Sequence, residues 1–412
     1  MQLLSDSWAL LLHAVASCKM NTLESKEARL EVAVPTDGAN RLRVCLPTTR
    51  NFARNAFRCG MYEAEDVFAE CADVDLLYLE PGKRFKLRSR LQRRLLFKDI
   101  SRRLAYANPG LQPVQLAKDY DLFMLVCPIY SDPLYVNAIR GWKERCRTSV
   151  CWIDELWAHH VPQYKYWLPL LREFDHVILG LSGSVEAISN AIGRRCHYVP
   201  GGVDALRFSP YPDPPARVID VYSIGRRSVR IHQSLLGLAS RKQVFYIHDT
   251  LQNASDNQTW DHRAHRDLYA NMAKRCRFFM VAPGLTNNAK VTGGQVEVGF
   301  RYYEGAAAGA VLVGNTPDCE TFRRGFDWPD AVIDIKADGS DTTEVLKKLA
   351  AQPDRLQEIS RRNAAEALLR HDWVYRWKEI LAIAGLKPTS AMEAREKRLN
   401  ELAKLARSDR VI

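Results

Sequence analysis

The sequence predicts an α/β protein with two doubly wound parallel sheets, each forming a Rossmann-like domain. Short apolar runs of strand length alternate with helix-length segments along most of the chain, as they do in βαβ units with right-handed crossovers. The length of 412 residues favours two domains of ordinary size. A segment rich in Gly and Pro, residues 200–215, interrupts the alternation and has the composition of a linker.

In the first half of the chain, apolar runs predict the strands of one parallel sheet. These runs are Leu42–Leu46, Val74–Leu79, Leu122–Cys127, Ser149–Ile153, His176–Leu181 and Cys196–Val199. Helices are expected between them, one reaching about Ala72, one at Pro133–Arg145 and one at Ser184–Ile192. Ligands of such sheets bind at the carboxyl ends of the strands. The polar residues at these ends are Thr48, Thr49, Arg50, Asn51, Asp154, Glu155, His159 and His160.

The segment Lys83–Arg103 predicts a basic amphipathic helix, because it carries ten Lys/Arg and a single acid, Asp99. The apolar residues that recur every four positions are Leu87, Leu91 and Leu95. We favour a solvated basic face whose leucines pack on the sheet. The alternatives are a patch that contacts anionic membrane headgroups and a nucleic-acid patch, for which aromatic residues are few.

In the second half, the expected strands are Val218–Ile224, Gln243–Ile247, Phe278–Val281, Ala310–Val313 and Ala331–Ile335. Helices are expected at Leu268–Arg275, Thr343–Ala350, Pro353–Leu369 and from Ser390 onward. The stretch after Phe278–Val281 predicts a phosphate site. Gly299 precedes a helix made mostly of small residues, which Gly309 ends, and free N–H groups at a helix N-terminus bind anions.

Composition excludes several other classes. No apolar run is long enough to span a membrane, and the apolar content of 47% and charged content of 26% are those of a globular protein. The ten cysteines occur singly, which favours a reducing compartment and argues against a zinc site. A net charge of +11 indicates an anionic partner. We interpret the start of the chain as a poorly ordered extension rather than a signal peptide.

Three segments resemble GT-B glycosyltransferases of family 4, and especially their spore-maturation-type branch. Residues 299–313, GFRYYEGAAAGAVLV, resemble the donor-site signature. Residues 198–210, YVPGGVDALRFSP, resemble the crossover between the two domains. Residues 371–377, HDWVYRW, resemble the ending at which the last helix returns to the first domain. The resemblance extends from about Leu42 to Leu386 and implies a GT-B fold.

The resemblance also implies roles for individual residues. Glu304 would bind the nucleotide ribose, and Glu297 stands one residue away from the family's sugar-binding Glu. Arg226 is the first choice for the donor diphosphate. The predicted donor-binding residues are Glu304, Arg301, Gly299, Glu297, Arg226, Arg230 and Thr316. The candidate catalytic residues are His159, His160 and Asp154, and the acceptor side is predicted at Thr48, Thr49, Arg50 and Asn51.

The sequence thus predicts a glycosyltransferase (EC 2.4, hexosyltransferase-type) that moves a sugar from a nucleotide-diphosphate-sugar to an acceptor hydroxyl with retention of configuration. The resemblance implies no bound cofactor and no metal. The expected acceptor is a polysaccharide or lipid-linked glycan, the expected location is cytoplasmic, at the inner face of the membrane, and no nucleic acid is expected. The alternatives are an epimerase of the same fold, an inactive GT-B relic that binds a nucleotide or partner, and a basic nucleic-acid-binding protein.

The expected domains are an N-terminal extension (residues 1–40), an acceptor domain (41–205), a nucleotide-sugar domain (206–372) and C-terminal helices that return toward the first domain (373–412).

Overall fold

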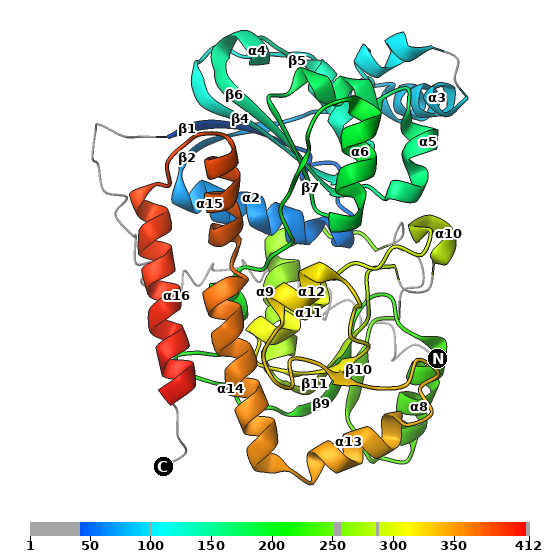
Figure 1. Ribbon diagram of the computed structural model, residues 1–412, viewed down its shortest axis with the longest axis vertical. Helices are drawn as coiled ribbons and strands as arrows, with labels where there is room; N and C mark the ends of the chain where they lie inside the picture. The colour runs from blue at the N-terminus through cyan, green and yellow to red at the C-terminus, as the bar shows by residue number, and fades with distance from the viewer. Residues whose placement is uncertain (1–41, 99–100, 251–256, 286–287, 409–412) are drawn as a thin grey trace, which may run out of the picture. The chain divides into compact units, whose positions relative to one another are not determined.

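The computed structural model describes residues 42–98, 101–250, 257–285 and 288–408, and its first sheet is parallel (Figure 1). The strand order is β2-β1-β4-β6-β7-β8. The strands are β1 (Arg43–Thr48), β2 (Asp73–Tyr78), β4 (Tyr120–Ile129), β6 (Cys146–Glu155), β7 (His176–Leu179) and β8 (His197–Tyr198). Because β2 and β4 flank β1 on opposite sides, the strand order reverses beside β1, as in doubly wound folds.

The second sheet is also parallel, with the order β10-β9-β11-β12-β13. Its strands are β9 (Ile219–Ser223), β10 (Tyr246–His248), β11 (Cys276–Val281), β12 (Val311–Gly314) and β13 (Ile333–Asp334). Here the order reverses between β9 and β11. The prediction of two doubly wound parallel sheets is confirmed. The strands of each sheet lie within the predicted domains 41–205 and 206–372, whose exact boundaries stay a prediction, and the predicted extension 1–40 lies outside the described residues.

Helices and short 3-10 turns connect the strands of the first sheet. They are η1 (Ala56–Arg58), α2 (Cys59–Cys71), α3 (Phe85–Phe97), η2 (Arg102–Tyr106), η3 (Asp132–Ala138), α4 (Trp142–Arg145), η4 (Ala158–His160), α5 (Val161–Tyr164), η5 (Leu168–Glu173), η6 (Ser182–Ser184) and α6 (Val185–Ile192). The predicted continuous helix Pro133–Arg145 is wrong. Strand β5 (Ile139–Arg140) interrupts it to pair with β3 (Val114–Gln115), and Gly141 then turns the chain with a φ of 78°.

The second half of the chain is more helical. Its helices are α7 (Ala205–Phe208), α8 (Val229–Ser240), α9 (His262–Lys274), α10 (Ala289–Thr292), α11 (Phe300–Ala307), α12 (Glu320–Gly325), α13 (Thr342–Ala350), α14 (Pro353–Arg370), α15 (Trp373–Ile383) and α16 (Ser390–Ser408). Helix α16 runs beside α14 (Figure 1) and buries Met392, Leu399 and Leu402. None of the described helices is long and apolar enough to cross a membrane.

The largest hydrophobic cluster joins residues of both sheets. Its centre is aromatic: Phe68 of α2 stacks on Trp377 of α15 with ring centroids 4.1 Å apart. The indole of Trp377 donates to the Ala64 carbonyl oxygen at 2.9 Å, and Trp152 of β6 packs edge-on against the same ring. The segment 373–383 follows the last strand of the second sheet in the chain, but it packs on α2, the helix that connects β1 and β2 of the first sheet.

Helix α3 forms where the basic amphipathic segment predicts it, but two leucines of the predicted stripe, Leu87 and Leu91, do not pack on the sheet. Leu87 and Leu91 are 66% and 52% exposed. The residues buried under α3 are Ser89, Gln92 and Leu96. The amide of Gln92 donates to the carbonyl oxygens of Leu104 and Ala107, so a polar side chain anchors the helix. The expectation that the leucine stripe faces the protein is wrong.

Candidate active site

A cleft of about 600 Å³ opens where the carboxyl ends of the two sheets meet. From the first sheet it is lined by residues that end or follow β4, β6 and β7, among them Ile129, Asp154, Glu155 and Gly180. From the second sheet it is lined by residues that follow β9 and β11 and by α11, among them Gly225, Arg226, Gly299, Arg301 and Glu304. The strand order of the second sheet reverses between β9 and β11, and this is the place where doubly wound sheets bind ligands.

Helix α11 begins in the wall of the cleft and lies close to its sheet. Gly299 is the extended residue before the helix. A Cβ at Gly305 would lie 2.6 Å from a Leu312 side-chain atom and 2.8 Å from one of Phe279, so only glycine permits this approach of helix to strand. Gly309 ends the segment with a φ of 61°, a value that glycine adopts without strain. The small-residue helix is present as predicted.

Two arginines lie beside the first turn of α11. The Arg301 Nε donates to the Ile224 carbonyl oxygen, and its guanidinium fills the space above Gly225, where a Cβ would lie 1.9 Å from Nη2. Burial lowers the pKa of Arg226, opposed by Glu155 and reinforced by Arg301. Neither arginine forms an ion pair with any described residue. Two guanidiniums that form no ion pair with the described residues, placed beside a helix N-terminus, form an electrostatic site for an anion.

Glu304 lies one turn into α11, lines the cleft and is 4% exposed. One of its carboxylate oxygens accepts from Arg266 of α9, and the other accepts from the Tyr269 hydroxyl at 2.7 Å. Burial alone would lower the pKa of Arg266, but the two carboxylates of Glu63 and Glu304 raise it well above its usual value. These two partners, both on α9, hold the Glu304 carboxylate in orientation.

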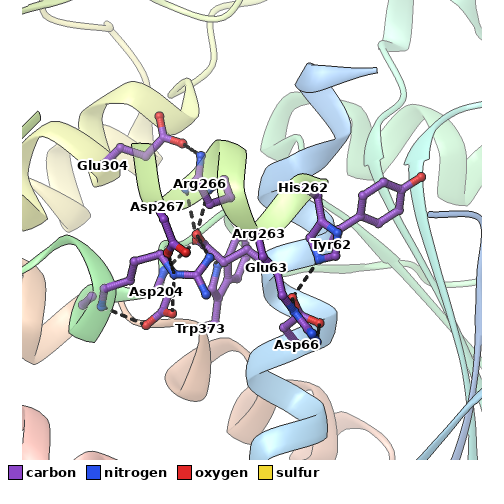
Figure 2. A network of polar contacts seen from close by, with 12 residues as sticks. Tyr62, Glu63, Asp66, Asp204, His262, Arg263, Arg266, Asp267, Glu304 and Trp373 are labelled. Atoms are coloured by element: carbon purple, nitrogen blue, oxygen red, sulfur yellow. Dashed lines mark hydrogen bonds and ion pairs between the residues drawn. The ribbon is translucent and has the colours of Figure 1, made fainter. Parts of the chain in front are cut away.

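Arg266 connects Glu304 to the first sheet (Figure 2). Its Nε and Nη2 donate to the two carboxylate oxygens of Glu63 on α2 at 2.7 and 3.0 Å. Glu63 is fully buried and also accepts from the Trp373 indole at 3.1 Å and the Asp204 backbone N–H at 2.8 Å. One arginine thus bridges two buried carboxylates, Glu63 of α2 and Glu304 of α11, and Arg207 lies 3.7 Å from Glu63 as a second cation.

Glu297 also lines the cleft, but its carboxylate already has partners. It accepts from the Ser182 and Gly183 backbone N–H groups at 3.3 and 2.8 Å, from the Ser182 hydroxyl at 3.1 Å and from Gln295 at 2.6 Å. The stretch around Ser182 lacks the glycine spacing of a dinucleotide fingerprint. Its N–H groups at the start of α6 bind the side chain of Glu297 instead.

Asp154 stands at the end of β6 in the first sheet and lines the cleft. Burial raises the pKa of Asp154 to about 8, with a further contribution from Glu155. Trp157 donates to Glu155 at 3.0 Å, which fixes the neighbouring carboxylate. Asp154 is thus a carboxyl group that exchanges a proton near neutral pH, and general acids and bases need this property.

The two histidines lie near the cleft but do not line it. His159 is exposed, and the turn at Gly293 packs against its Cβ. Burial lowers the pKa of His160, reinforced by His159 and opposed by Glu155, and the His160 Nδ1 lies 3.4 Å from the Tyr164 hydroxyl.

Several predicted site residues lie outside the cleft. Arg230 is exposed on α8, and Thr316 bonds to Asp334 through its N–H and its hydroxyl. On the predicted acceptor side, the Thr48 hydroxyl donates to Glu65 at 2.7 Å, and the buried Arg50 pairs with Glu65 and Asp66. The Thr49 hydroxyl contacts Tyr62 and the Asn51 amide donates to the Leu79 carbonyl oxygen. The roles predicted for these residues stay a prediction.

The sequence did not single out Arg266, Tyr269 or Glu63. Arg266 shares a helical face with Tyr269, Ala270 and Ala273, all of them buried. A charged residue within an apolar helical face signals a buried partner of opposite charge, and this signal was available. Among the described residues, no group of three or more His, Cys, Asp or Glu side chains is placed to hold a metal ion; metal independence itself stays a prediction.

Comparisons with known proteins agree with the two-sheet fold. Residues 226–382 match the family described as Glycosyl transferase-like, whereas a comparison with curated proteins finds no match. The fold is similar to that of an alpha-glucosyltransferase solved in complex with UDP, with a TM-score of 0.52 and 12% identity over 84% of this chain and 100% of that one.

The same alpha-glucosyltransferase, in complex with UDP and a 13-mer DNA containing an HMU base, gives a TM-score of 0.50 and 11% identity over the same shares of the two chains. The HepE protein of Anabaena, in complex with UDP and glucose, gives a TM-score of 0.46 and 14% identity, again over 84% of this chain and 100% of that chain. The chain has the GT-B fold, two Rossmann-like units that face a cleft, and its second unit carries a glycosyltransferase-like sequence.

Proposed function

We propose that the protein is a glycosyltransferase that moves a sugar from a nucleoside-diphosphate sugar to an acceptor hydroxyl. The observation that carries the proposal is the anion site in the cleft, where the N-terminus of α11 meets Arg226 and Arg301. The solved alpha-glucosyltransferase of similar fold is described in complex with UDP, and the match of residues 226–382 to a glycosyltransferase-like family supports the same donor chemistry.

In the proposed complex the donor diphosphate binds at Gly299–Arg301. When the sugar leaves, the developing negative charge on the nucleoside diphosphate is stabilised by the α11 N–H groups and the two guanidiniums. Arginine suits this role because its planar fork binds two phosphate oxygens and stays charged. These groups supply the positive charge that a metal ion supplies in other enzymes, and we propose that transfer needs no metal.

The ribose would bind to Glu304, which is already oriented by Arg266 and Tyr269. A carboxylate that is positioned before the ligand arrives accepts hydroxyl hydrogen bonds with little reorganisation. Glu297 is assigned to the sugar end of the donor. Its carboxylate accepts hydrogen bonds from Ser182 and Gly183 of η6, which follows β7 of the first sheet. A donor sugar that contacts Glu297 would therefore also lie close to the end of β7.

Asp154 is the acid–base candidate that the cleft supports best. A carboxyl with a pKa near 8 is mostly protonated at neutral pH, so it can donate a hydrogen bond or a proton, and its smaller ionised fraction can accept a proton from an acceptor hydroxyl. We retain the expectation that configuration is preserved and that no side chain forms a covalent bond to the sugar. Closure of the cleft around the donor would exclude water, which otherwise hydrolyses it.

The acceptor is proposed to be the hydroxyl of a glycan, polysaccharide or lipid-linked. Its entrance would lie beside Asp154 and Glu155, which line the cleft at the end of β6. The nine cysteines of the described residues are free thiols, which is compatible with a reducing compartment and with work at the cytoplasmic face of a membrane.

The test is a transfer assay with UDP-, GDP-, ADP-, CDP- and dTDP-sugars, in which release of the nucleoside diphosphate is measured for wild type, Arg301→Ala and Arg230→Ala. We expect wild type to release one nucleotide class. Arg301→Ala should be slower by about a hundredfold. Arg230→Ala should be unchanged, because Arg230 is exposed and outside the cleft. If the protein binds a nucleotide but releases no nucleoside diphosphate from any donor sugar, the result would instead favour an inactive GT-B relic.

A further inference from the structure

Helix α3 presents an apolar stripe to solvent. Leu87 and Leu91 are 66% and 52% exposed, and Phe97 at the end of the helix is 42% exposed. The opposite face holds the helix in place through Ser89, Gln92 and Leu96. Leu87 and Leu91 lie one turn apart, so they form one exposed apolar face rather than scattered single side chains.

Basic side chains surround this stripe. Residues 83–98 contain eight Lys/Arg and no acid, and none of the eight forms an ion pair with a described residue. Arg90 and Arg94 lie three residues after Leu87 and Leu91, so leucines and arginines share one helical face. Seven of these eight cations are exposed, and Arg93 is half-buried.

An anionic bilayer satisfies both features at once. Leucine side chains enter the boundary between headgroups and acyl chains, while Lys and Arg extend their charged ends to the lipid phosphates. Nucleic acid would use the charges but leave the leucines in water, and the exposed aromatic residues that stack on bases are few along α3. We propose that the face of α3 formed by Leu87, Arg90, Leu91 and Arg94 docks on the surface of an anionic membrane.

The docking face lies close to the cleft. Helices α3 and α5 pack together (Figure 1), and Phe97 contacts Tyr130 and Tyr164 with ring centroids 6.5 and 5.8 Å away. Tyr130 stacks on Tyr164 at 4.5 Å and directly follows Ile129, which lines the cleft. Docking would therefore hold the acceptor side of the cleft near the bilayer. Taken together with the proposed function, on which this step rests, the acceptor is a glycan carried by a membrane lipid.

The test is cosedimentation with vesicles of phosphatidylcholine alone and of phosphatidylcholine with phosphatidylglycerol, without any nucleotide. We expect wild type to bind only the anionic vesicles. The double variant Leu87→Ser/Leu91→Ser should bind at least tenfold more weakly, because it loses the two leucine side chains that would enter the membrane surface. Its matched control is Leu268→Ser/Leu405→Ser, which removes leucines that are 65% and 45% exposed on α9 and α16 and should bind as wild type does.

The charge arm compares Arg90→Gln/Arg94→Gln with Lys347→Gln/Lys348→Gln on α13. Each basic residue at an anionic surface contributes a factor of about five in binding, so the first pair should lose roughly 25-fold and the control pair little. Equal binding of wild type and the leucine variant would overturn the proposal. So would loss in the charge variant alone, with duplex DNA or RNA bound in place of vesicles, since this outcome indicates a polyanion surface.

These results are independent of the donor chemistry. Because the assay contains no nucleotide, a failure to bind vesicles removes the membrane face and leaves the transferase proposal standing. If the transfer assay fails while vesicle binding is intact, the transferase proposal is wrong and the membrane face remains.

Discussion

Arg266 is the residue whose removal most directly tests the buried network that holds the cleft together. In Arg266→Met, the carboxylate of Glu304 would lose its ion-pair partner, and that of Glu63 would keep only Arg207, whose Nη1 lies 3.7 Å from it. Both carboxylates are buried, at 0% exposed for Glu63 and 4% for Glu304. Removing one member of a buried ion pair typically costs about 3–5 kcal/mol, because the remaining charge is uncompensated. The Trp373 indole and Tyr269 hydroxyl still donate to the two carboxylates, so we expect a loss toward the lower end, about 3 kcal/mol.

The control variant is Arg263→Met, one turn earlier on the same helix. Arg263 pairs with Asp66 at 2.9 Å, but its side chain is 60% exposed, and exposed pairs contribute about 0–1 kcal/mol. Both variants would be measured by urea unfolding followed by fluorescence and circular dichroism. Coincident transitions from the two probes would justify a single free energy of unfolding.

A triple variant completes the design. Glu63→Gln/Arg266→Met/Glu304→Gln removes all three charges, so it should recover most of the loss of Arg266→Met. The reasoning is refuted if Arg266→Met is no less stable than Arg263→Met. It is also refuted if the triple variant is as unstable as the single one, because the unpaired charges would then not be the cause.

Three further predictions concern the cleft. Gly225→Ala should weaken nucleotide binding at least tenfold, because the added Cβ would lie 1.9 Å from the Arg301 Nη2 and would force the guanidinium to move. The control is Gly294→Ala, where φ is similarly positive but a Cβ would have no neighbour within 4 Å. Equal losses of affinity for the two variants in a calorimetric titration would contradict the role of Arg301. Asp154 binds its proton more tightly folded, with a pKa of about 8 against 3.8, so its contribution to stability is complete below pH 4 and is lost as the pH rises toward 8; urea unfolding should show Asp154→Asn gaining on wild type from pH 5 to pH 8, and a constant difference would contradict the assignment. Excess EDTA should leave nucleotide release unchanged, and a loss restored by Mg²⁺ or Mn²⁺ would reveal a metal requirement.

The parts of the fold that depend on local pattern could be predicted from the sequence. The short strands β11 and β12 follow from buried apolar runs, and α11 follows from Gly299, its small residues and Gly309. These features are set by residues near one another in the chain. The predicted helix Pro133–Arg145 failed because a tertiary contact, the pairing of β5 with β3, took precedence over local helix preference.

The buried network could not be predicted in the same way. Glu63 and Arg266 are separated by 203 positions, and no local pattern links them. Helix α3 illustrates a different limit. Periodicity revealed a leucine stripe, but not which face of the helix packs inward, because Gln92 found two carbonyl acceptors and could be buried in place of Leu87 and Leu91.

The central claim is that the cleft binds a nucleoside diphosphate beside Arg226, and a thermal-shift screen tests it most directly. UDP, GDP, ADP, CDP and dTDP would be added to wild type, Arg226→Ala and Arg230→Ala. At about a hundred times its Kd, a ligand adds about 2.7 kcal/mol of stability. We predict that one nucleotide raises the melting temperature of wild type and Arg230→Ala, and raises that of Arg226→Ala much less. If no nucleotide raises that of wild type, or all three proteins respond alike, the proposed donor site is wrong.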